Sequence, residues 1–503
     1  MTGERHRGRT ARALGWSVSG QLGVQAIRFA FGVVLARLLS PHEFGLLAMV
    51  AVLTQFAITT ADLGLEDALV QRRTLDETHR SSIFWVTVAG GALLGLVTVG
   101  LAPWVAAFYG VEELRPLTTT LSGLFVVRAI GTVPRALLVR NLDFRRTVEA
   151  EGAATVVAGV AAVLLAWRGF GVTSLAVQLL AGAALESVLL LRACGWRPRA
   201  TLRFAAVAEL GGFASNRAAT RVLGYWSQHV DELLVGKLLG VGALGLYGRA
   251  GGVVRFPVLY VSRATARVMF PALARIHDDP ARVRDTYLRA TGGVALATVP
   301  LCLGLFATAE PLVLGLLGAH WREMIPLVRI LAVAAVLQSI TTLASSLYLS
   351  QGRPDLHLRL NVLQTIVMLA ATLVGQRWGV HGVAVAYVCG SLLVAVPTLA
   401  VAGRLVGLRL RDVLARTVPV LLAGAAMAGV VLALDAALGA RIAPLGALAV
   451  EVTAGALVYA ATVRSFGMQP YRDVVDVLGG VSAVEPGRER ARRRARGAAG
   501  SES

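Results

Sequence analysis

The sequence predicts an all-α, polytopic membrane protein with about 14 transmembrane helices. Of its 503 residues, 56% are hydrophobic and 16% are charged, whereas a soluble domain is about 45–50% apolar and about 25% charged. A soluble chain of this length has no interior large enough for that apolar surface. Fourteen runs also approach the ~20 mostly apolar residues that a spanning helix needs. Composition thereby excludes a disordered chain, a coiled coil and a disulfide scaffold.

The apolar runs divide into two sets of six and a final pair. The first set covers 14–38, 44–64, 82–107, 116–138, 149–167 and 172–192. The second set covers 207–235, 243–263, 290–310, 325–348, 358–376 and 381–403. The final pair covers 415–436 and 443–464. The first run is not a cleaved signal peptide, because Arg28 and Arg37 interrupt its apolar part.

Basic residues predict how the helices are oriented. The net charge is +19, and Lys237 is the only lysine among 49 basic residues. Arginines crowd the N-terminal tail, the loop predicted at 264–289 and the C-terminal run from Arg488 to Arg496, all on one side of the predicted bundle. By the positive-inside rule both termini are cytoplasmic and the protein lies in the cell membrane. The arginines therefore act as topology signals, and nucleic acid is not an expected partner.

Two stretches of the chain repeat one another. VVLARLLSPHEFGLL at 33–47 aligns without gaps to LLVGKLLGVGALGLY at 233–247, which pairs Arg37 with Lys237 and Gly45 with Gly245. Further on, Pro116 aligns with Pro326, and GVTSLA at 171–176 with GVHGVA at 379–384. We expect two six-helix lobes at 1–203 and 204–406, two further helices at 407–465 and a basic cytoplasmic tail at 466–503. Transporters built from such repeats bind substrate between the lobes.

Polar residues form stripes within the predicted spans. Ser17, Gln21, Gln25 and Arg28 are three or four residues apart and share one helical face. The aligned run carries Arg217, Arg221, Gln228 and Asp231 at similar spacing. Arg128, Thr132 and Arg135 likewise align with Gln338, Thr342 and Ser345. Ionisable residues in a membrane usually face a cavity or a partner, so these stripes predict a hydrated cavity between the lobes.

The predicted cavity is cationic. Arginine binds phosphate oxygens bidentately and stays protonated, so the cavity suits a diphosphate. The candidate diphosphate ligands are Arg28, Arg128, Arg217, Arg221, Arg249 and Arg255, and the other polar lining is Gln21, Gln25, Gln228 and Gln338. Asp231 is the candidate for a coupling cation or proton. In the alternative, each arginine snorkels or pairs with a structural acid such as Glu186, Asp62 or Glu66.

Several chemical motifs are absent from the sequence. There is no GxxxxGK[ST] phosphate loop, no HExxH and no paired-cysteine site, since Cys194, Cys302 and Cys389 lie far apart. The chain therefore does not hydrolyse ATP through a phosphate loop, and no metal or other cofactor is expected. We expect a transporter and not an enzyme.

Several segments resemble a known family. The strongest are VVLARLLSPHEFGLLAM, ALLVRNLDFRRT, HVDELLVGKLLGVGALGLYGRA, VMFPALARIHDDPARVRDTYLRA and LYLSQGRPDLHLRLN. They look like the polysaccharide-exporter branch of the multidrug/oligosaccharidyl-lipid/polysaccharide flippase superfamily. That branch includes the Wzx-type flippases of O-antigen (lipopolysaccharide) and colanic-acid repeat units. The resemblance covers residues 12–465.

This resemblance implies a V-shaped bundle of fourteen helices with alternating access. It also implies flipping of undecaprenyl-diphosphate-linked oligosaccharide to the outer leaflet for surface polysaccharide synthesis. Expected partners are that polyprenyl-diphosphate-linked oligosaccharide, membrane lipids, and a polysaccharide polymerase or glycosyltransferases. The alternatives are a cation-coupled drug or metabolite exporter of the same superfamily, a membrane-embedded glycosyltransferase or polymerase, and a scaffold for a synthase.

Overall fold

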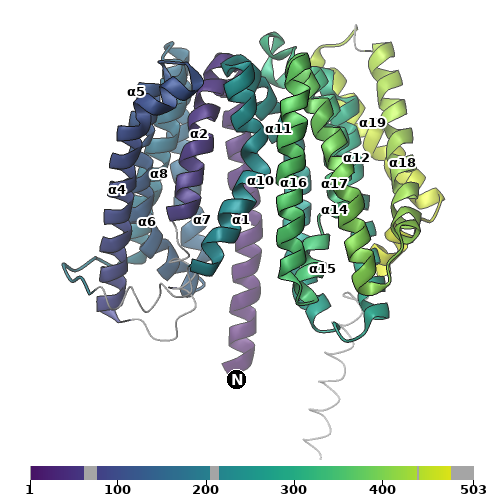
Figure 1. Cartoon of the computed structure of the whole chain (residues 1–503), viewed down its shortest axis with the longest axis horizontal. Coiled ribbons are helices and arrows are strands. Elements are labelled where there is room, and N and C mark those ends of the chain that lie inside the picture. Colours follow the sequence, from purple (N-terminus) through teal and green to yellow (C-terminus); the bar gives the residue numbers. More distant parts are fainter. Residues whose placement is uncertain (1, 62–68, 70–75, 204–214, 439–440, 477–503) are drawn as a thin grey trace, which may run out of the picture. The chain divides into compact units, whose positions relative to one another are not determined.

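The computed structural model is built from long helices (Figure 1). It describes residues 2–61, 69, 76–203, 215–438 and 441–476, without the side chains of 2–19, 60–61, 215–223, 263 and 438. Over these residues no β-strand occurs. The predicted all-α class is therefore confirmed.

Eleven described segments are long and apolar enough to cross a membrane. One of them, Pro354–Val406, contains two helices, α16 (Pro354–Gly375) and α17 (Gly379–Val406), joined by the short η3 (Gln376–Trp378). The helices α10 (Ser215–Leu239) and α11 (Val241–Ala274) carry several charged residues and are not among the eleven. The chain is thus a multi-pass membrane protein, and the exact count of fourteen stays a prediction.

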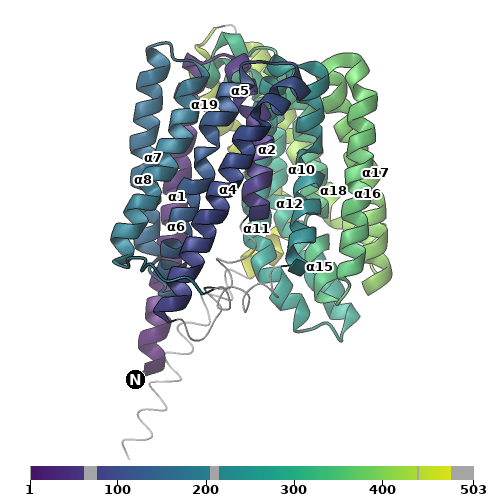
Figure 2. The same ribbon diagram turned by 60° about the vertical axis from the view of Figure 1, so that its left-hand side comes forward.

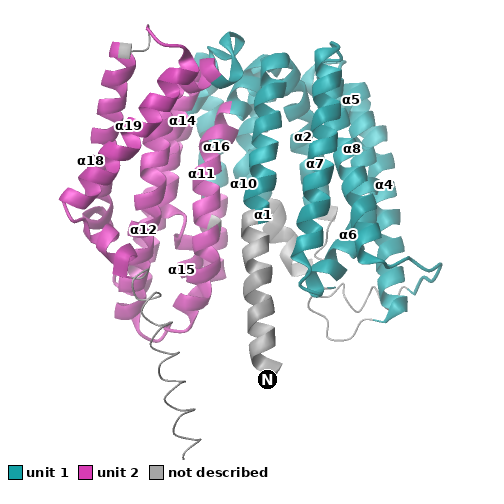
Figure 3. Cartoon of the chain, turned by 180° about the vertical axis from the view of Figure 1, so that it is seen from behind, with its two compact units in different colours: residues 1–249, 316–324, 364–386 teal, residues 250–315, 325–363, 387–503 magenta. Residues whose placement is uncertain are grey.

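The described chain forms two compact units (Figure 3). Unit 1 comprises residues 1–249, 316–324 and 364–386. Its helices are α1 (Thr2–Leu38), α2 (Pro41–Ala61), α4 (Glu77–Tyr109), α5 (Leu114–Leu121), α6 (Gly123–Arg140), α7 (Phe144–Trp167), α8 (Val172–Cys194), α10, the start of α11, η2 (Ala319–Trp321), the end of α16, η3 and the start of α17. Its core is made of apolar clusters such as Leu35, Ala162 and Leu175.

Unit 2 comprises residues 250–315, 325–363 and 387–503. It holds the rest of α11, α16 and α17 together with α12 (Pro280–Ala307), α13 (Ala309–Leu312), most of η1 (Val313–Leu317), α14 (Met324–Thr341), α15 (Ala344–Ser350), α18 (Leu410–Leu438) and α19 (Pro444–Ser465). One of its apolar clusters surrounds Tyr287 and Tyr348, which are buried with Leu273 and Ala402. The predicted lobes at 1–203 and 204–406 are a division by sequence repeat and stay a prediction.

The segment predicted as a long loop at 264–289 is mostly helical. Helix α11 continues to Ala274, and α12 already begins at Pro280, where Asp279 accepts a hydrogen bond from the Arg282 backbone N–H at 3.1 Å. Charged residues at helix ends gave this stretch the composition of a loop. The connection itself is only a short turn, since an N-cap aspartate followed by proline starts the next helix at once.

Residues that the repeat aligns with each other meet in unit 1. An added Cβ at Gly45 on α2 would lie 2.0 Å from the Val241 carbonyl oxygen, and one at Gly245 on α11 would lie 1.8 Å from the Pro41 carbonyl oxygen. Only glycine allows two helix backbones to approach so closely. The alignment of Gly45 with Gly245 thus corresponds to a direct contact of the two helices.

The aligned cations Arg37 and Lys237 each donate a hydrogen bond to a backbone carbonyl of the other repeat copy. Arg37 Nε donates to the Leu316 carbonyl at 2.8 Å, and Lys237 Nζ donates to the Phe108 carbonyl. Phe108 lies eight residues before Pro116, and Leu316 lies ten before Pro326, so the two acceptors occupy nearly matching places in the repeat. Each cation therefore satisfies a carbonyl that belongs to the other copy of the repeat.

We expect Gly45→Ala and Gly245→Ala each to lower the thermal unfolding temperature of the detergent-solubilised protein. The new methyl group must displace backbone atoms, and such overpacking costs about 1–3 kcal/mol. Gly248→Ala, also on α11, is the matched control because its Cβ meets nothing within 4 Å. Equal unfolding temperatures for the Gly45 and Gly248 variants would show that the close approach is absent.

Candidate functional site

Four helices of unit 1 bring charged side chains together inside the membrane-spanning region. Helix α1 packs along α7, α7 along α8, and α8 along α6, and these helices stand side by side in Figure 2. Helix α7 starts where Asp143 accepts from the Arg146 backbone N–H at 3.3 Å. Each of the four contains a segment apolar enough to span a bilayer. The charged groups on their facing sides are therefore removed from bulk water.

Glu151 on α7 accepts hydrogen bonds from two residues of the polar stripe on α1. Its Oε1 accepts from Arg28 Nη2 at 2.8 Å, and its Oε2 accepts from Gln21 Nε2 at 3.1 Å. Gln21 and Arg28 are seven residues apart, or two helical turns, and so reach the same carboxylate. The side chain of Glu151 is 9% exposed and that of Arg28 is 48% exposed. Arg28 therefore has one side paired and the other accessible.

A second ion pair joins α6 to α8. Arg135 donates to Glu186 Oε1. Next to it, Ser187 Oγ donates to the Val127 carbonyl at 2.8 Å, and an added Cβ at Gly131 would lie 2.7 Å from that hydroxyl. The small residue at 131 lets α8 lie close against α6. This close packing keeps Arg135 on α6 opposite Glu186 on α8.

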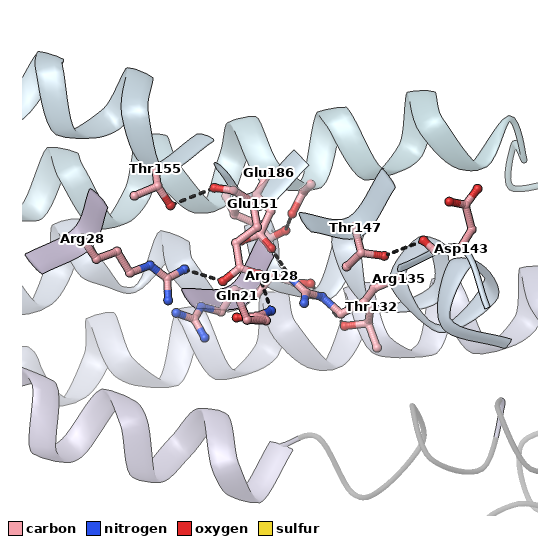
Figure 4. Close-up of polar contacts among 12 residues, drawn as sticks. Gln21, Arg28, Arg128, Thr132, Arg135, Asp143, Thr147, Glu151, Thr155 and Glu186 are labelled. Atoms are coloured by element: carbon pink, nitrogen blue, oxygen red, sulfur yellow. Dashed lines mark hydrogen bonds and ion pairs between the residues drawn. The ribbon is translucent and has the colours of Figure 1, made fainter. Parts of the chain in front are cut away.

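Arg128 lies in the same group of side chains, two helical turns before Arg135 on α6 (Figure 4). The charges of Glu186, Arg135 and Arg28 all act on it. Among the described residues its guanidinium donates no hydrogen bond and forms no ion pair, and the residue is exposed. Arg28 and Arg128 both lie near the middle of their spans, Gly20–Leu38 and Leu114–Arg140. The Arg–Glu cluster, defined as Arg28, Arg128, Arg135, Glu151 and Glu186, thus has one more positive than negative group.

Most of the other candidate ligands have local partners. Arg249 Nη2 donates to the Gly32 carbonyl at 2.6 Å, and its guanidinium lies over the Phe44 ring at 5.1 Å. Arg255 Nε donates to the Gly251 carbonyl at 3.3 Å, within α11. Gln228 Nε2 donates to the Gly224 carbonyl at 3.3 Å within α10. Gln25 is half-buried on α1.

Gln338 and Asp231 each have a hydroxyl partner of their own. Gln338 belongs to unit 2, where its Nε2 donates to the Tyr387 hydroxyl at 2.9 Å. Asp231 is 3% exposed, and the Tyr247 hydroxyl donates to its Oδ2 at 2.7 Å. A buried carboxylate with a hydroxyl donor is compatible with the predicted cation or proton role, which stays a prediction.

Two predicted ligands fall outside the described side chains, and one residue was missed. Arg217 and Arg221 lie on α10, but their side chains are not described, so their role stays a prediction. Of the acids proposed as structural partners, Glu186 does pair with an arginine, whereas Asp62 and Glu66 lie outside the described residues. Glu151 was not among the predicted residues. Its position within the predicted span 149–167 was the available signal, because an acid there needs a partner.

Comparison with known families identifies the chain. A family described as "Polysaccharide biosynthesis protein" matches residues 34–326, more than half of the sequence. The chain belongs to this family. The match begins after Arg28 on α1 and includes α2, α6, α7 and α8, together with the aligned residues Gly45 and Gly245.

Relatives of this polysaccharide biosynthesis protein come from several bacteria. It is 26% identical over 388 residues to the lipopolysaccharide biosynthesis protein WzxC of Escherichia coli, which covers 76% of this chain and 78% of the relative. It is 29% identical to the succinoglycan biosynthesis transport protein ExoT of Rhizobium meliloti, over 64% of this chain and 65% of the relative. It is 26% identical to the teichuronic acid biosynthesis protein TuaB of Bacillus subtilis, over 66% and 69%.

Solved structures share the fold. The inward closed conformation of the lipid II flippase MurJ superposes with a TM-score of 0.73 at 14% identity, over 91% of this chain and 99% of that one. An inward-facing multidrug resistance MATE transporter of the MOP superfamily superposes with a TM-score of 0.60 at 16% identity, over 76% and 94%. The predicted all-α, MATE-like fold is therefore confirmed.

We expect Glu151→Ala to lower the free energy of unfolding by about 1–3 kcal/mol, because it leaves Arg28 and Gln21 without an acceptor in a low-dielectric setting. Glu149→Ala is the matched control on the same helix. Glu149 pairs with Arg145 at 2.7 Å, but both side chains are more than half exposed, and exposed pairs contribute about 0–1 kcal/mol. Thermal unfolding in detergent measures both. Similar losses for the two variants would mean that Glu151 is not held as described.

Proposed function

We propose that this protein flips polyprenyl-diphosphate-linked oligosaccharides across the cytoplasmic membrane during surface polysaccharide synthesis. Family membership supports a role in polysaccharide synthesis, and the names of the relatives describe biosynthesis and transport of bacterial polysaccharides. The observation that carries the substrate class is the Arg–Glu cluster of unit 1. In it, Arg128 has no anionic partner among the described side chains.

The chemistry of the cluster suits a diphosphate. Arg128 offers a planar set of donors that matches two phosphate oxygens, and the accessible side of Arg28 offers a second set. Glu151 and Glu186 neutralise two of the three arginines. A diphosphate that enters the cluster competes with Glu151 for Arg28. The substrate is thereby bound by charge, while the two glutamates limit the repulsion among the three arginines.

The transport step in this proposal is alternating access. The lobes at 1–203 and 204–406 would rock about the cluster, with both termini cytoplasmic, while the polyprenyl tail stays among the membrane lipids. Arg217 and Arg221 would approach the headgroup from the second lobe. The substrate would come from glycosyltransferases and pass to a polymerase. The proposal requires neither a cofactor nor nucleic acid, and it assigns no enzymatic step to the chain.

We expect Arg128→Ala to lower the transport rate by about 10–100-fold, which corresponds to the ~1.5–3 kcal/mol of a charge-assisted hydrogen bond. The measurement uses purified protein in liposomes loaded with a fluorescent short-chain polyprenyl-diphosphate oligosaccharide. Arg145→Ala on the surface of α7 is the control and should transport normally. Full transport by the Arg128 variant would contradict the proposed site. Preferred transport of a cationic drug by the wild type would favour a drug exporter instead.

We expect Glu151→Gln to bind the same lipid about 10-fold more tightly, because the amide keeps the shape of the carboxylate but no longer neutralises Arg28. Quenching of the fluorescent lipid in detergent gives the affinity, and Glu149→Gln is the control. Unchanged or weaker binding by the Glu151 variant would indicate that the diphosphate does not reach Arg28.

A further inference from the structure

Helices α18 and α19 of unit 2 bring together a buried and a half-buried carboxyl group that the proposed function does not use. Glu451 on α19 is 2% exposed. Its side chain lies next to that of Asp435 on α18, which packs against α19. Among the described residues no N–H or O–H group of the protein donates to Glu451 Oε2. Both helices are apolar enough to span a membrane.

The packing of the two helices fixes this contact. They run side by side in Figure 3, and an added Cβ at Gly455 would lie 3.1 Å from Val431 Cγ2. Gly455 follows Glu451 by four residues, and Val431 precedes Asp435 by four. In two antiparallel helices, a step of one turn forward on one and backward on the other leads to the next facing pair. Gly455 opposite Val431 therefore independently places Glu451 opposite Asp435.

The described surroundings of the pair are apolar, and no cation among the described residues pairs with it. Val431 belongs to a buried cluster with Ala307 and Ala428, to which α12 contributes. The charged groups on the elements packed against α19 lie elsewhere. Glu310 on α13 pairs with Arg329 at 3.8 Å, and Arg441 is exposed in the connection to α19. The remaining charged residues lie at the opposite ends of their helices: Arg411, Asp412 and Arg416 on α18, Arg464 on α19, and Arg282, Arg284, Asp285 and Arg289 on α12. Arg464 and Arg416 are about 20 and 28 Å away along their helices.

We propose that Glu451 and Asp435 form a proton-binding site in which the two carboxyl groups share one proton at neutral pH. Two carboxylates can only accept hydrogen bonds, so a hydrogen bond between them requires one of them to be protonated. Two like charges in an apolar setting also repel strongly, which favours binding of one cation. Binding forms one O–H bond, and the net charge of the pair changes from −2 to −1.

A proton fits this site better than a metal ion does. A metal cation needs several oxygen ligands, and no group of three or more acidic, histidine or cysteine side chains occurs together in the described part of the chain. A shared proton needs only the two oxygens that are present. The site lies in unit 2 and the Arg–Glu cluster in unit 1, so the inference does not depend on the proposed substrate.

Infrared spectroscopy of the full-length protein in lipid bilayers tests the proposal. At neutral pH the wild type should show the C=O stretch of a protonated carboxylic acid, and this band should be absent from Glu451→Gln. The glutamine amide can donate to Asp435, so this variant should unfold at the same temperature as the wild type. Glu310→Gln is the matched control and should keep the band, because Glu310 is neutralised by Arg329.

A second measurement needs no variant. The wild-type protein is treated in the membrane with dicyclohexylcarbodiimide, which reacts with protonated carboxyl groups in apolar surroundings, and its peptides are analysed by mass spectrometry. We expect an adduct on Glu451 or Asp435 and none on Glu310. Absence of both the infrared band and the adduct overturns the proposal. Loss of the band when sodium is added at constant pH overturns it in favour of a metal cation.

Discussion

The interior of a bilayer does not solvate charge, and this constraint organises the polar part of the structure. Most of the charged side chains described above within a span have one of three kinds of partner. Glu151 and Glu186 meet arginines. Arg249 turns to a backbone carbonyl and an aromatic ring. Glu451 lies next to a second carboxyl group, that of Asp435, and we propose that the two share a proton. Arg128 alone among these stays accessible without an anion, which makes it stand out as a ligand for an anionic substrate.

Much of the fold was predictable from the sequence because its signals are local. Apolar runs of spanning length give the helices, and an all-α membrane bundle follows from them. The stripe of Gln21 and Arg28 was visible as a helical face. The error at 264–289 has a local cause too, since charged helix ends resemble a loop until the capping aspartate at 279 is considered.

The candidate site was only half predictable. Sequence spacing shows which arginines share a face, but it does not show which acid lies across from them. Glu151 comes from a helix more than a hundred residues away from Arg28, and its place in the cluster depends on the packing of α7 against α1. The pairing of Glu451 with Asp435 likewise depends on the register of α18 and α19. Relations across helices are set by packing, and a single sequence does not contain a simple signal for them.

The exchanged contacts of Arg37 and Lys237 bear on how the chain arose. Each cation completes the backbone of the other repeat copy, and Gly45 meets its own counterpart, Gly245. Such self-complementary pairing is the rule at the interface of a two-fold symmetric homodimer, where a residue near the axis touches its own equivalent. These contacts have the form expected if an ancestral polypeptide of half the length associated in pairs before its gene was fused in tandem.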